Sequence, residues 1–298
     1  MCGHKCYVTM DRRALSTADA VIFFPFYMRN FSAIYPTRTN PDQYFVFWEH
    51  ETPVRYPEKN VTFPKNYFNA TATYSLSADI PIPYGTYEPI ARNMTKEEYY
   101  EHLLEEIGRK TRGVYAVYSH CETESGREHV IRNLQKYINV DVYGQCRGGI
   151  ACDRECYNRN KENYRFYLSF ENSVCNDYAS EKFFNFNTLI PIVLKREYYK
   201  RHPQHSFIAV DDFGSLKELA DYLNLLSMDD KKYAEYLTWT YDKRRKPRGR
   251  HIMLCDVCDY VSKRPARKIY SDIDDFVDLG RSCDLNFKRD VIEGRILQ

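Results

Sequence analysis

The sequence predicts an α/β fold in which strands alternate with helices and form parallel sheets. Eight runs are apolar and β-favouring, as strands covered on both faces are. They lie at 18–26, 44–48, 68–74, 114–118, 140–144, 164–170, 189–194 and 207–210. Helical stretches or polar loops separate the runs, which is the pattern of parallel sheets with helices on their faces. A chain of 298 residues can bury two cores of ordinary domain size.

Two helices are marked by capping boxes, at 95–98 (TKEE) and 215–218 (SLKE). Each box opens a stretch with apolar residues at helical spacing. Arg127 begins a third amphipathic helix, and 229–241 is expected to form a tyrosine-rich one. A short polar stretch follows the first of these helices, and we place the domain boundary there. The predicted domains are 1–112 and 113–298.

The composition indicates a glycoprotein of an oxidising compartment. A net charge of +2 predicts no general attraction to nucleic acid or acidic surfaces. Ten cysteines occur together with four Asn-x-Ser/Thr sequons, which begin at Asn30, Asn60, Asn69 and Asn93. The alternative is a cytosolic chain with free thiols. No apolar run approaches the ~20 residues that span a bilayer, and the first residues lack the apolar core of a signal peptide.

Two local patterns have competing interpretations. The basic run at 243–250 is typical of a nuclear-localisation or nucleic-acid patch, but the neutral chain and the sequons favour a solvated basic loop. The spacing of Cys152 and Cys156 would also fit zinc. No second ligand pair is evident nearby, so we expect disulfides and no metal site.

The stretch 164–194 carries the strongest functional pattern. Its strand ends in polar residues at 171–173, at the carboxyl edge of a parallel sheet, where ligands bind in α/β folds. Asp177 or Ser180 can cap the following helix, whose first turn contains Lys182. A helix N-terminus with a lysine in its first turn favours an anionic ligand.

This stretch resembles the donor-binding motif of the α-1,3/α-1,4-fucosyltransferases, glycosyltransferase family 10, whose pattern is close to YxFxLxFENSxxxDYxTEK. Here FENS stands at 170–173, DY at 177–178 and SEK at 180–182, and the resemblance extends from residue 6 to beyond residue 254. The resemblance implies that GDP-fucose is contacted by Glu171, Asn172, Tyr178, Glu181 and Lys182. It also implies a pyrophosphate contact from Arg127, since the arginine fork pairs with phosphate oxygens. A solvated helix arginine is the alternative.

A second stretch that resembles the family concerns catalysis. The sequence ETP at 51–53 follows a strand where the family has an ESP-like motif, which implies that Glu51 is the general base. Glu49 is the less favoured carboxylate. On the residues alone, an exposed loop carboxylate is the expected interpretation. The family also ties a C-terminal CxxC to two N-terminal cysteines, which implies that Cys2 and Cys6 pair with Cys255 and Cys258.

The resemblance implies a GT-B fold, with two Rossmann-like domains facing a central cleft. The acceptor would bind 1–112, and GDP-fucose would bind 113–298, which includes the CxxC tail. The implied reaction is inverting transfer of L-fucose from GDP-β-L-fucose to the 3-hydroxyl of N-acetylglucosamine in glycoprotein or glycolipid glycans. No tightly bound cofactor is implied, and a divalent cation is at most stimulatory.

The resemblance also concerns location. Family members reside in the Golgi lumen and are held by an N-terminal membrane anchor. We interpret this chain as an invertebrate-like member that is truncated before the anchor, and we expect no nucleic-acid partner.

Three departures from the family pattern support a second hypothesis. Ser75 and Leu76 stand where many members have two arginines, the segment after Lys182 is short, and Lys195 replaces a glycine. They favour a catalytically impaired relative that binds nucleotide sugar or glycan. A nuclear nucleic-acid binder is a third interpretation, which rests only on 243–250.

Overall fold

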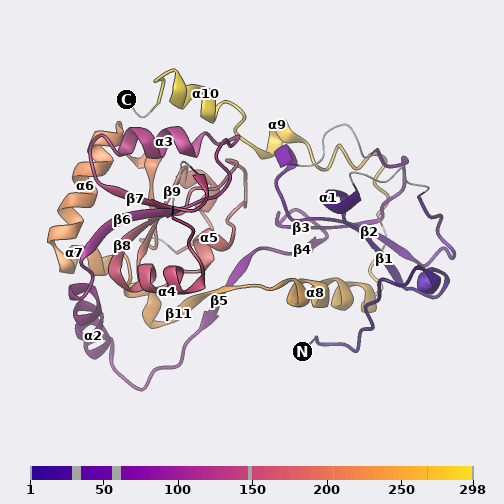
Figure 1. The fold of residues 1–298 in the computed structure, drawn as a ribbon. Coiled ribbons are helices and arrows are strands. Elements are labelled where there is room, and N and C mark those ends of the chain that lie inside the picture. Colours follow the sequence, from indigo (N-terminus) through magenta and orange to yellow (C-terminus); the bar gives the residue numbers. More distant parts are fainter. Residues whose placement is uncertain are drawn as a thin grey trace. The chain divides into compact units, whose positions relative to one another are not determined.

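The computed structural model describes residues 2–28, 35–55, 62–146, 150–203, 205–266 and 268–296. The chain forms two compact units, each with a parallel sheet (Figure 1). The first unit contains 1–84 and 248–283, and the second contains 85–247 and 284–298. The predicted α/β class, with one Rossmann-like sheet in each half of the chain, is therefore confirmed.

The first unit is built on a four-stranded parallel sheet in the order β1-β2-β3-β4. Its strands are β1 (Ala20–Phe23), β2 (Tyr44–Glu49), β3 (Ala70–Thr73) and β4 (Ile80–Pro81). Its helical segments are η1 (Arg12–Ser16), α1 (Pro25–Met28), η2 (Pro53–Arg55), α8 (Arg250–Ser262) and α9 (Leu279–Ser282). All residues of β2 are buried, as expected for a central strand covered on both faces.

Side chains of the sheet alternate between two cores of the first unit. On one face, Met253 and Val257 of α8 pack in a cluster with Val46 and Trp48 of β2 and Ile80 of β4. The other face is almost entirely aromatic, and its buried cluster contains Phe23, Phe45, Phe47, Phe68 and Ile273.

The second unit contains a five-stranded parallel sheet in the order β10-β9-β8-β6-β7. Its strands are β6 (Arg112–Val117), β7 (Val140–Tyr143), β8 (Tyr164–Leu168), β9 (Ile190–Val193) and β10 (Ile208–Ala209). An antiparallel ribbon of β5 (Gly85–Pro89) and β11 (Lys243–Pro247) belongs to the same unit.

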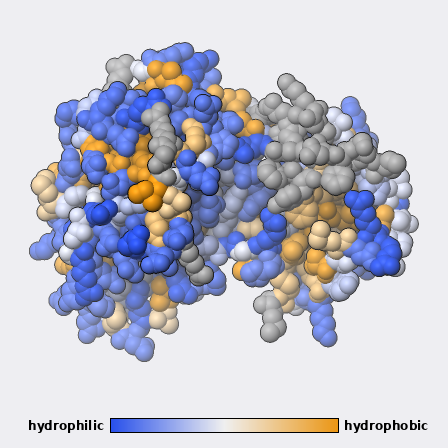
Figure 2. Space-filling view, viewed as in Figure 1, coloured by the Kyte–Doolittle hydropathy of each residue, from blue (hydrophilic) through white to orange (hydrophobic). Residues whose placement is uncertain are grey.

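Helices cover this second sheet on both faces (Figure 1). They are α2 (Lys96–Gly108), α3 (Arg127–Leu134), α4 (Arg154–Asn163), α5 (Glu181–Phe184), α6 (Leu216–Met228), α7 (Asp230–Glu235) and α10 (Phe287–Ile292), with short turns η4 (Arg196–Tyr199), η5 (Val210–Asp212) and η6 (Thr238–Tyr241). Aliphatic residues of α3 and α6 pack on one face, whereas tyrosines dominate the other. Figure 2 shows mainly hydrophilic residues on the visible surface, as expected where 28% of residues are charged.

The unit boundary differs from the sequence-based boundary at residue 112. It lies between Tyr84 and Gly85, and residues 248–283 return to the first unit instead of forming a tail of the second. Long-range packing is the reason: α2 contacts α7, β5 pairs with β11, and α8 packs in the core of the first sheet. The polar stretch before β6 is only the connection from α2 to the sheet.

The basic run at 243–250 is also different from the expected solvated loop. Its first five residues form β11, and strand alternation sends neighbouring side chains to opposite sides. Arg244 and Lys246 are exposed and pair with Glu88, whereas Arg245 is only 2% exposed.

Candidate functional site

Glu171 is the buried centre of the predicted donor site. It lies just beyond the carboxyl end of β8 and is 4% exposed. Its two carboxylate oxygens accept hydrogen bonds from the Ser180 backbone N–H (2.8 Å) and from Ser180 Oγ (2.7 Å). Ser180 is also the N-cap of α5, so Ser180 begins this helix and Asp177 does not. One carboxylate therefore fixes the start of α5 to the end of β8.

Lys182 places a positive charge next to this carboxylate. Its Nζ lies 3.4 Å from Glu171 Oε2 and donates hydrogen bonds to Glu181 Oε1 and Ser180 Oγ, both at 3.1 Å. Burial alone would lower the pKa of Lys182, but the charges of Glu171 and Glu181 outweigh burial and raise it. Lys182 is therefore a cation at neutral pH, held at an N-terminal turn that itself favours anions.

Arg127 lies against the same loop. Its side chain is buried, its Nη1 donates to the Phe170 carbonyl (2.9 Å) and its Nη2 donates to the His120 carbonyl (3.2 Å). Its charge also acts on Lys182, where it works to lower the lysine pKa. The structure thus brings Arg127, Glu171 and Lys182 together, although 55 residues separate the two cations in the sequence.

The turn before α3 aims Arg127 at this loop. Gly126 has φ +61°, and a Cβ there would lie 2.8 Å from the Lys288 side chain, so glycine is required. Ser125 donates its backbone N–H to the Asn172 carbonyl (2.9 Å) and its hydroxyl to the Glu171 carbonyl (2.7 Å). The sequence analysis did not identify Ser125, whose only signal is its place two residues before the predicted arginine.

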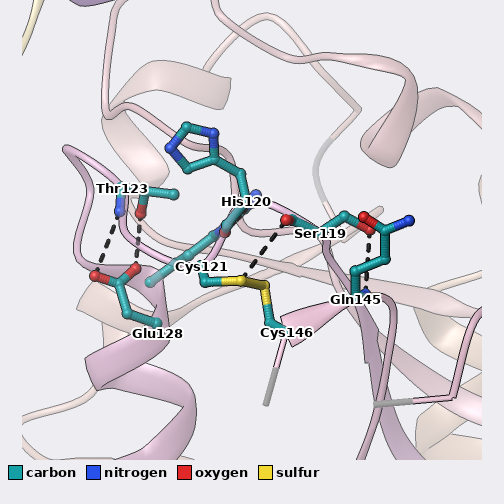
Figure 3. Close-up of a disulfide and its surroundings, with 8 residues drawn as sticks. Ser119, His120, Cys121, Thr123, Glu128, Gln145 and Cys146 are labelled. Atoms are coloured by element: carbon teal, nitrogen blue, oxygen red, sulfur yellow. Dashed lines mark hydrogen bonds between the residues drawn. A yellow bond between two sulfur atoms is a disulfide. The ribbon is translucent and has the colours of Figure 1, made fainter. Parts of the chain in front are cut away.

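A disulfide holds the preceding loop. Cys121, which follows β6, is bonded to Cys146, which follows β7 (Figure 3). In the same view, the Thr123 hydroxyl donates to Glu128 of α3 (2.8 Å). The covalent bond and this hydrogen bond restrict the segment that carries His120, whose carbonyl binds Arg127.

Two further residues that were predicted to contact the nucleotide sugar lie in the same loop. Tyr178 is 3% exposed, and its backbone N–H donates to the Cys175 carbonyl (3.2 Å). Asn172 is half-buried and is held through its carbonyl by Ser125. Asp177 has φ +60°, which turns the chain sharply between these two residues. All six predicted donor residues therefore belong to the second unit and gather at or beside the carboxyl edge of β8.

The candidate base Glu51 belongs to the first unit and follows β2. Its backbone N–H donates to Glu49 Oε1 (2.9 Å), as does the N–H of His50, so the buried Glu49 shapes the turn. The ring of His50 stacks on Tyr84 at 3.7 Å. Glu51 itself is about one-third exposed, with Arg55 Nε 3.8 Å from its carboxylate. Glu51 is thus the accessible carboxylate of the pair, and Glu49 is a structural one.

The cysteine pairs implied by the resemblance are present. Cys2 is bonded to Cys255 and Cys6 to Cys258, which fixes the first residues of the chain to α8. Cys152 and Cys156 also form a disulfide, so they do not offer a zinc site.

The sequons have different outcomes. Asn69 is 3% exposed, its Oδ1 accepts from the Phe45 N–H (2.7 Å), and its Nδ2 donates to the Gln43 carbonyl. A glycan on this amide has no place in the folded chain, so the prediction at Asn69 is wrong. Asn93 is exposed and stays a prediction. Asn30 and Asn60 lie outside the described residues.

A cavity of about 540 Å³ lies elsewhere in the second unit. It is bounded by α4 and by the tyrosines of β7 and β8, and its lining includes Arg112, Tyr143, Arg159 and Tyr164. None of the six donor candidates lines this cavity. Among the described residues, no helix is long and apolar enough to cross a bilayer.

Comparison with known families assigns this chain to a family. The family model described as glycosyltransferase family 10 (fucosyltransferase) C-term matches residues 107–276, and the model described as fucosyltransferase, N-terminal matches residues 2–85. Two units that each contain a parallel sheet are consistent with a nucleotide-sugar transferase. The chain belongs to glycosyltransferase family 10, the fucosyltransferases.

Curated relatives support the assignment. The chain is 33% identical over 286 residues to alpha-(1,3)-fucosyltransferase fut-1 of Caenorhabditis elegans, covering 89% of this chain and 62% of that protein. It is 36% identical over 249 residues to glycoprotein 3-alpha-L-fucosyltransferase A of Drosophila melanogaster, covering 78% and 46%. It thus spans about half to three-fifths of these relatives. A crystal structure of an alpha1,3-fucosyltransferase with GDP-fucose has 18% identity, a TM-score of 0.48 and 78% coverage of each chain.

Proposed function

We propose that this chain transfers L-fucose, with inversion, from GDP-β-L-fucose to the 3-hydroxyl of N-acetylglucosamine in glycoprotein or glycolipid glycans. The observation that carries this proposal is the buried cluster of Glu171, Ser180 and Lys182 with Arg127 beside it. The cluster lies at the carboxyl edge of a parallel sheet, where α/β folds bind nucleotides. Membership of the fucosyltransferase family supplies the donor and acceptor classes.

The second unit is assigned the donor. Lys182 and Arg127 offset the negative charge that grows on the departing diphosphate, so no metal is required for this role. Arg127 is buried and held by two backbone carbonyls, so its positive charge acts on the site from beside Lys182. Glu171 is buried and positions Lys182. Glu181 is 52% exposed and is the better placed carboxylate to face positive charge on the fucose ring.

The first unit is assigned the acceptor. Glu51 takes the proton of the sugar 3-hydroxyl while that oxygen bonds to C1 of fucose and the C1–O bond to the diphosphate breaks. Inversion follows because the hydroxyl attacks opposite the leaving group. We place the reaction in the Golgi lumen, since all ten cysteines are in disulfides, which persist in oxidising compartments.

Two variants test the two assignments separately. We expect Lys182→Met to weaken GDP binding by about tenfold or more, because a charge-assisted contact to phosphate is lost. We expect Glu51→Gln to keep GDP affinity and to lower transfer by about 10²–10⁴-fold. Calorimetry with GDP, and transfer to N-acetyllactosamine and chitobiose-core acceptors with and without EDTA, provide the measurements.

Lys217→Met is the matched control, because Lys217 is an exposed lysine on α6 that pairs with Asp221. Full GDP affinity in Lys182→Met would remove Lys182 from the donor site. Undiminished transfer by Glu51→Gln would remove Glu51 as the base, and loss of transfer in EDTA would contradict a metal-independent reaction.

A glycan-binding or nucleotide-sugar-binding module without turnover is the second candidate function. The observation that favours it is the length of α5, whose single turn provides few residues to line a donor pocket. GDP or glycan binding by the wild-type chain, without transfer to either acceptor, would support this candidate over the enzyme.

A further inference from the structure

The buried arginine of the basic run has no role in the assigned chemistry. Arg245 is 2% exposed in β11, and no carboxylate of the described chain pairs with it within 4 Å. Burial lowers its pKa to about 10, so the group is still charged at neutral pH. A buried cation without a carboxylate partner is destabilising unless other contacts hold it.

Those contacts are made with the elements around α5. The guanidinium carbon lies 4.3 Å from the ring centroid of Phe183 and 4.6 Å from that of Trp239, so the group is sandwiched between two aromatic faces. Its Nη1 donates to the Phe186 carbonyl (2.8 Å) and its Nη2 to the Ser206 carbonyl (2.6 Å). Phe183 lies within α5, and Phe186 follows its end.

The backbone of Arg245 is fixed to the same segment. The N–H of Arg245 donates to Asn187 Oδ1 (2.7 Å), and Asn187 Nδ2 donates back to the Arg245 carbonyl (3.2 Å). On the paired strand, a Cβ at Gly85 would lie 2.1 Å from Phe184, so the ribbon packs directly on α5 there. The ribbon of β5 and β11 therefore packs against α5 through Phe183 and Phe184.

A helix of four residues is not stable by itself, because helix nucleation is unfavourable and so few residues cannot offset its free-energy cost. Its N-terminus is held by Glu171 through Ser180. Its other end is held by Arg245 through Phe183 and Phe186. The position of Lys182, between these two attachments, depends on both.

We propose that Arg245 is a positioning residue for the donor site, which holds α5 so that Glu181 and Lys182 face the nucleotide sugar. The expected effect of Arg245 on GDP binding rests on the proposed function. Its expected effect on the position of α5 does not. Lysine cannot replace this arginine, because a planar fork stacks between two rings and makes two directed hydrogen bonds, whereas an ammonium is a point charge.

The test compares Arg245→Lys with Arg244→Met, an adjacent β11 residue that is exposed and pairs with Glu88. Hydrogen exchange of the peptide 178–187 is measured first, without donor. We expect about tenfold faster exchange in Arg245→Lys and no change in Arg244→Met. GDP affinity is then measured by calorimetry, below the melting temperature of each variant, and we expect about tenfold weaker binding in Arg245→Lys only.

The outcomes separate the two proposals. Unchanged exchange in a folded Arg245→Lys would overturn the positioning role, and faster exchange with unchanged GDP affinity would overturn its link to the donor site. A wild-type chain that does not bind GDP would overturn the proposed function while the exchange result stands. If Arg245→Lys does not fold, Asn187→Ala provides the same comparison, because it releases the Arg245 backbone while keeping the guanidinium. Unchanged hydrogen exchange in Asn187→Ala would likewise overturn the positioning role of Arg245.

Discussion

Glu171 and Glu181 belong to one motif, yet burial gives them different chemistry. Burial raises the pKa of Glu171, and Lys182 and the Ser180 hydrogen bonds oppose that increase. For Glu181, the effect of burial is outweighed by Lys182, and the pKa is lowered. Glu171 therefore acts as a structural anchor, whereas Glu181 is an exposed anion that can interact with a ligand. At the scale of residues, the environment decides the role of each carboxylate.

His202 provides a pH-dependent prediction at the same scale. Its ring packs on Phe183 (4.4 Å) and its Nδ1 bonds the Tyr87 hydroxyl (2.9 Å). Burial, and then the charge of Arg245, lower its pKa from 6.5 to about 3. As the pH falls below 6.5, the unfolded chain takes up the proton first, so stability decreases until the pH reaches about 3.

We expect this group to remove about 1.4 kcal/mol of unfolding free energy between pH 7.5 and pH 5.5. His202→Gln can keep a hydrogen bond to Tyr87 but does not titrate, so it should lack this part of the decrease. Urea unfolding of both proteins at the two pH values measures the difference. Parallel pH profiles would show that His202 is protonated equally in the folded and unfolded chains.

At the scale of elements, the turn before α3 determines the position of the Arg127 side chain. Gly126 has a positive φ and contacts Lys288, so Gly126→Ala introduces both backbone strain and a steric clash. We expect a loss of about 1–3 kcal/mol in stability together with weaker GDP binding, because Arg127 follows immediately. Gly113→Ala in β6 is the control, since a Cβ there has no neighbour within 4 Å. Equal stability of the two variants would contradict the strain argument.

The basic run shows how pairing decides the meaning of a charge pattern. Charge spacing alone predicted a solvated loop at 243–250, because successive basic residues are usually exposed. Pairing with β5 turned the first half into a strand, and alternation then buried Arg245 between Arg244 and Lys246. Nothing local indicates this burial, because the two rings that receive Arg245 come from α5 and η6.

At the scale of the whole molecule, two disulfides close the longest loops of the first unit. Cys2–Cys255 and Cys6–Cys258 span 253 and 252 residues, whereas Cys152–Cys156 spans four. Loop-closure entropy therefore predicts a loss of about 5 kcal/mol for a single bond that closes a loop of this length, with a further loss when both are removed, and about 2 kcal/mol for the short one.

The comparison uses Cys2→Ser with Cys6→Ser against Cys152→Ser with Cys156→Ser, measured by thermal unfolding. The first pair should lower the melting temperature of the first unit more than the second pair lowers that of the second unit. An equal or smaller effect of the first pair would contradict an entropic origin of this stabilisation.

Much of this organisation could be predicted from the sequence. The apolar runs placed the strands to within a few residues, and the capping boxes placed the starts of α2 and α6. The pairing of Cys2 and Cys6 with the CxxC segment followed from the family resemblance. The motif at 170–182 correctly indicated residues that gather at one sheet edge. These features could be predicted because hydrophobic periodicity, helix caps and sequence motifs are local properties of a chain.

Other features depended on tertiary contacts. The return of 248–283 to the first unit, the burial of Asn69 and Arg245, and the link from Ser125 to the loop after β8 each join segments distant in sequence. By itself, the sequence determined the fold class and the family, and it predicted the residues proposed to contact the nucleotide sugar. Only the tertiary structure decided which carboxylate anchors and which is exposed, because desolvation and hydrogen bonding depend on what surrounds a side chain in space.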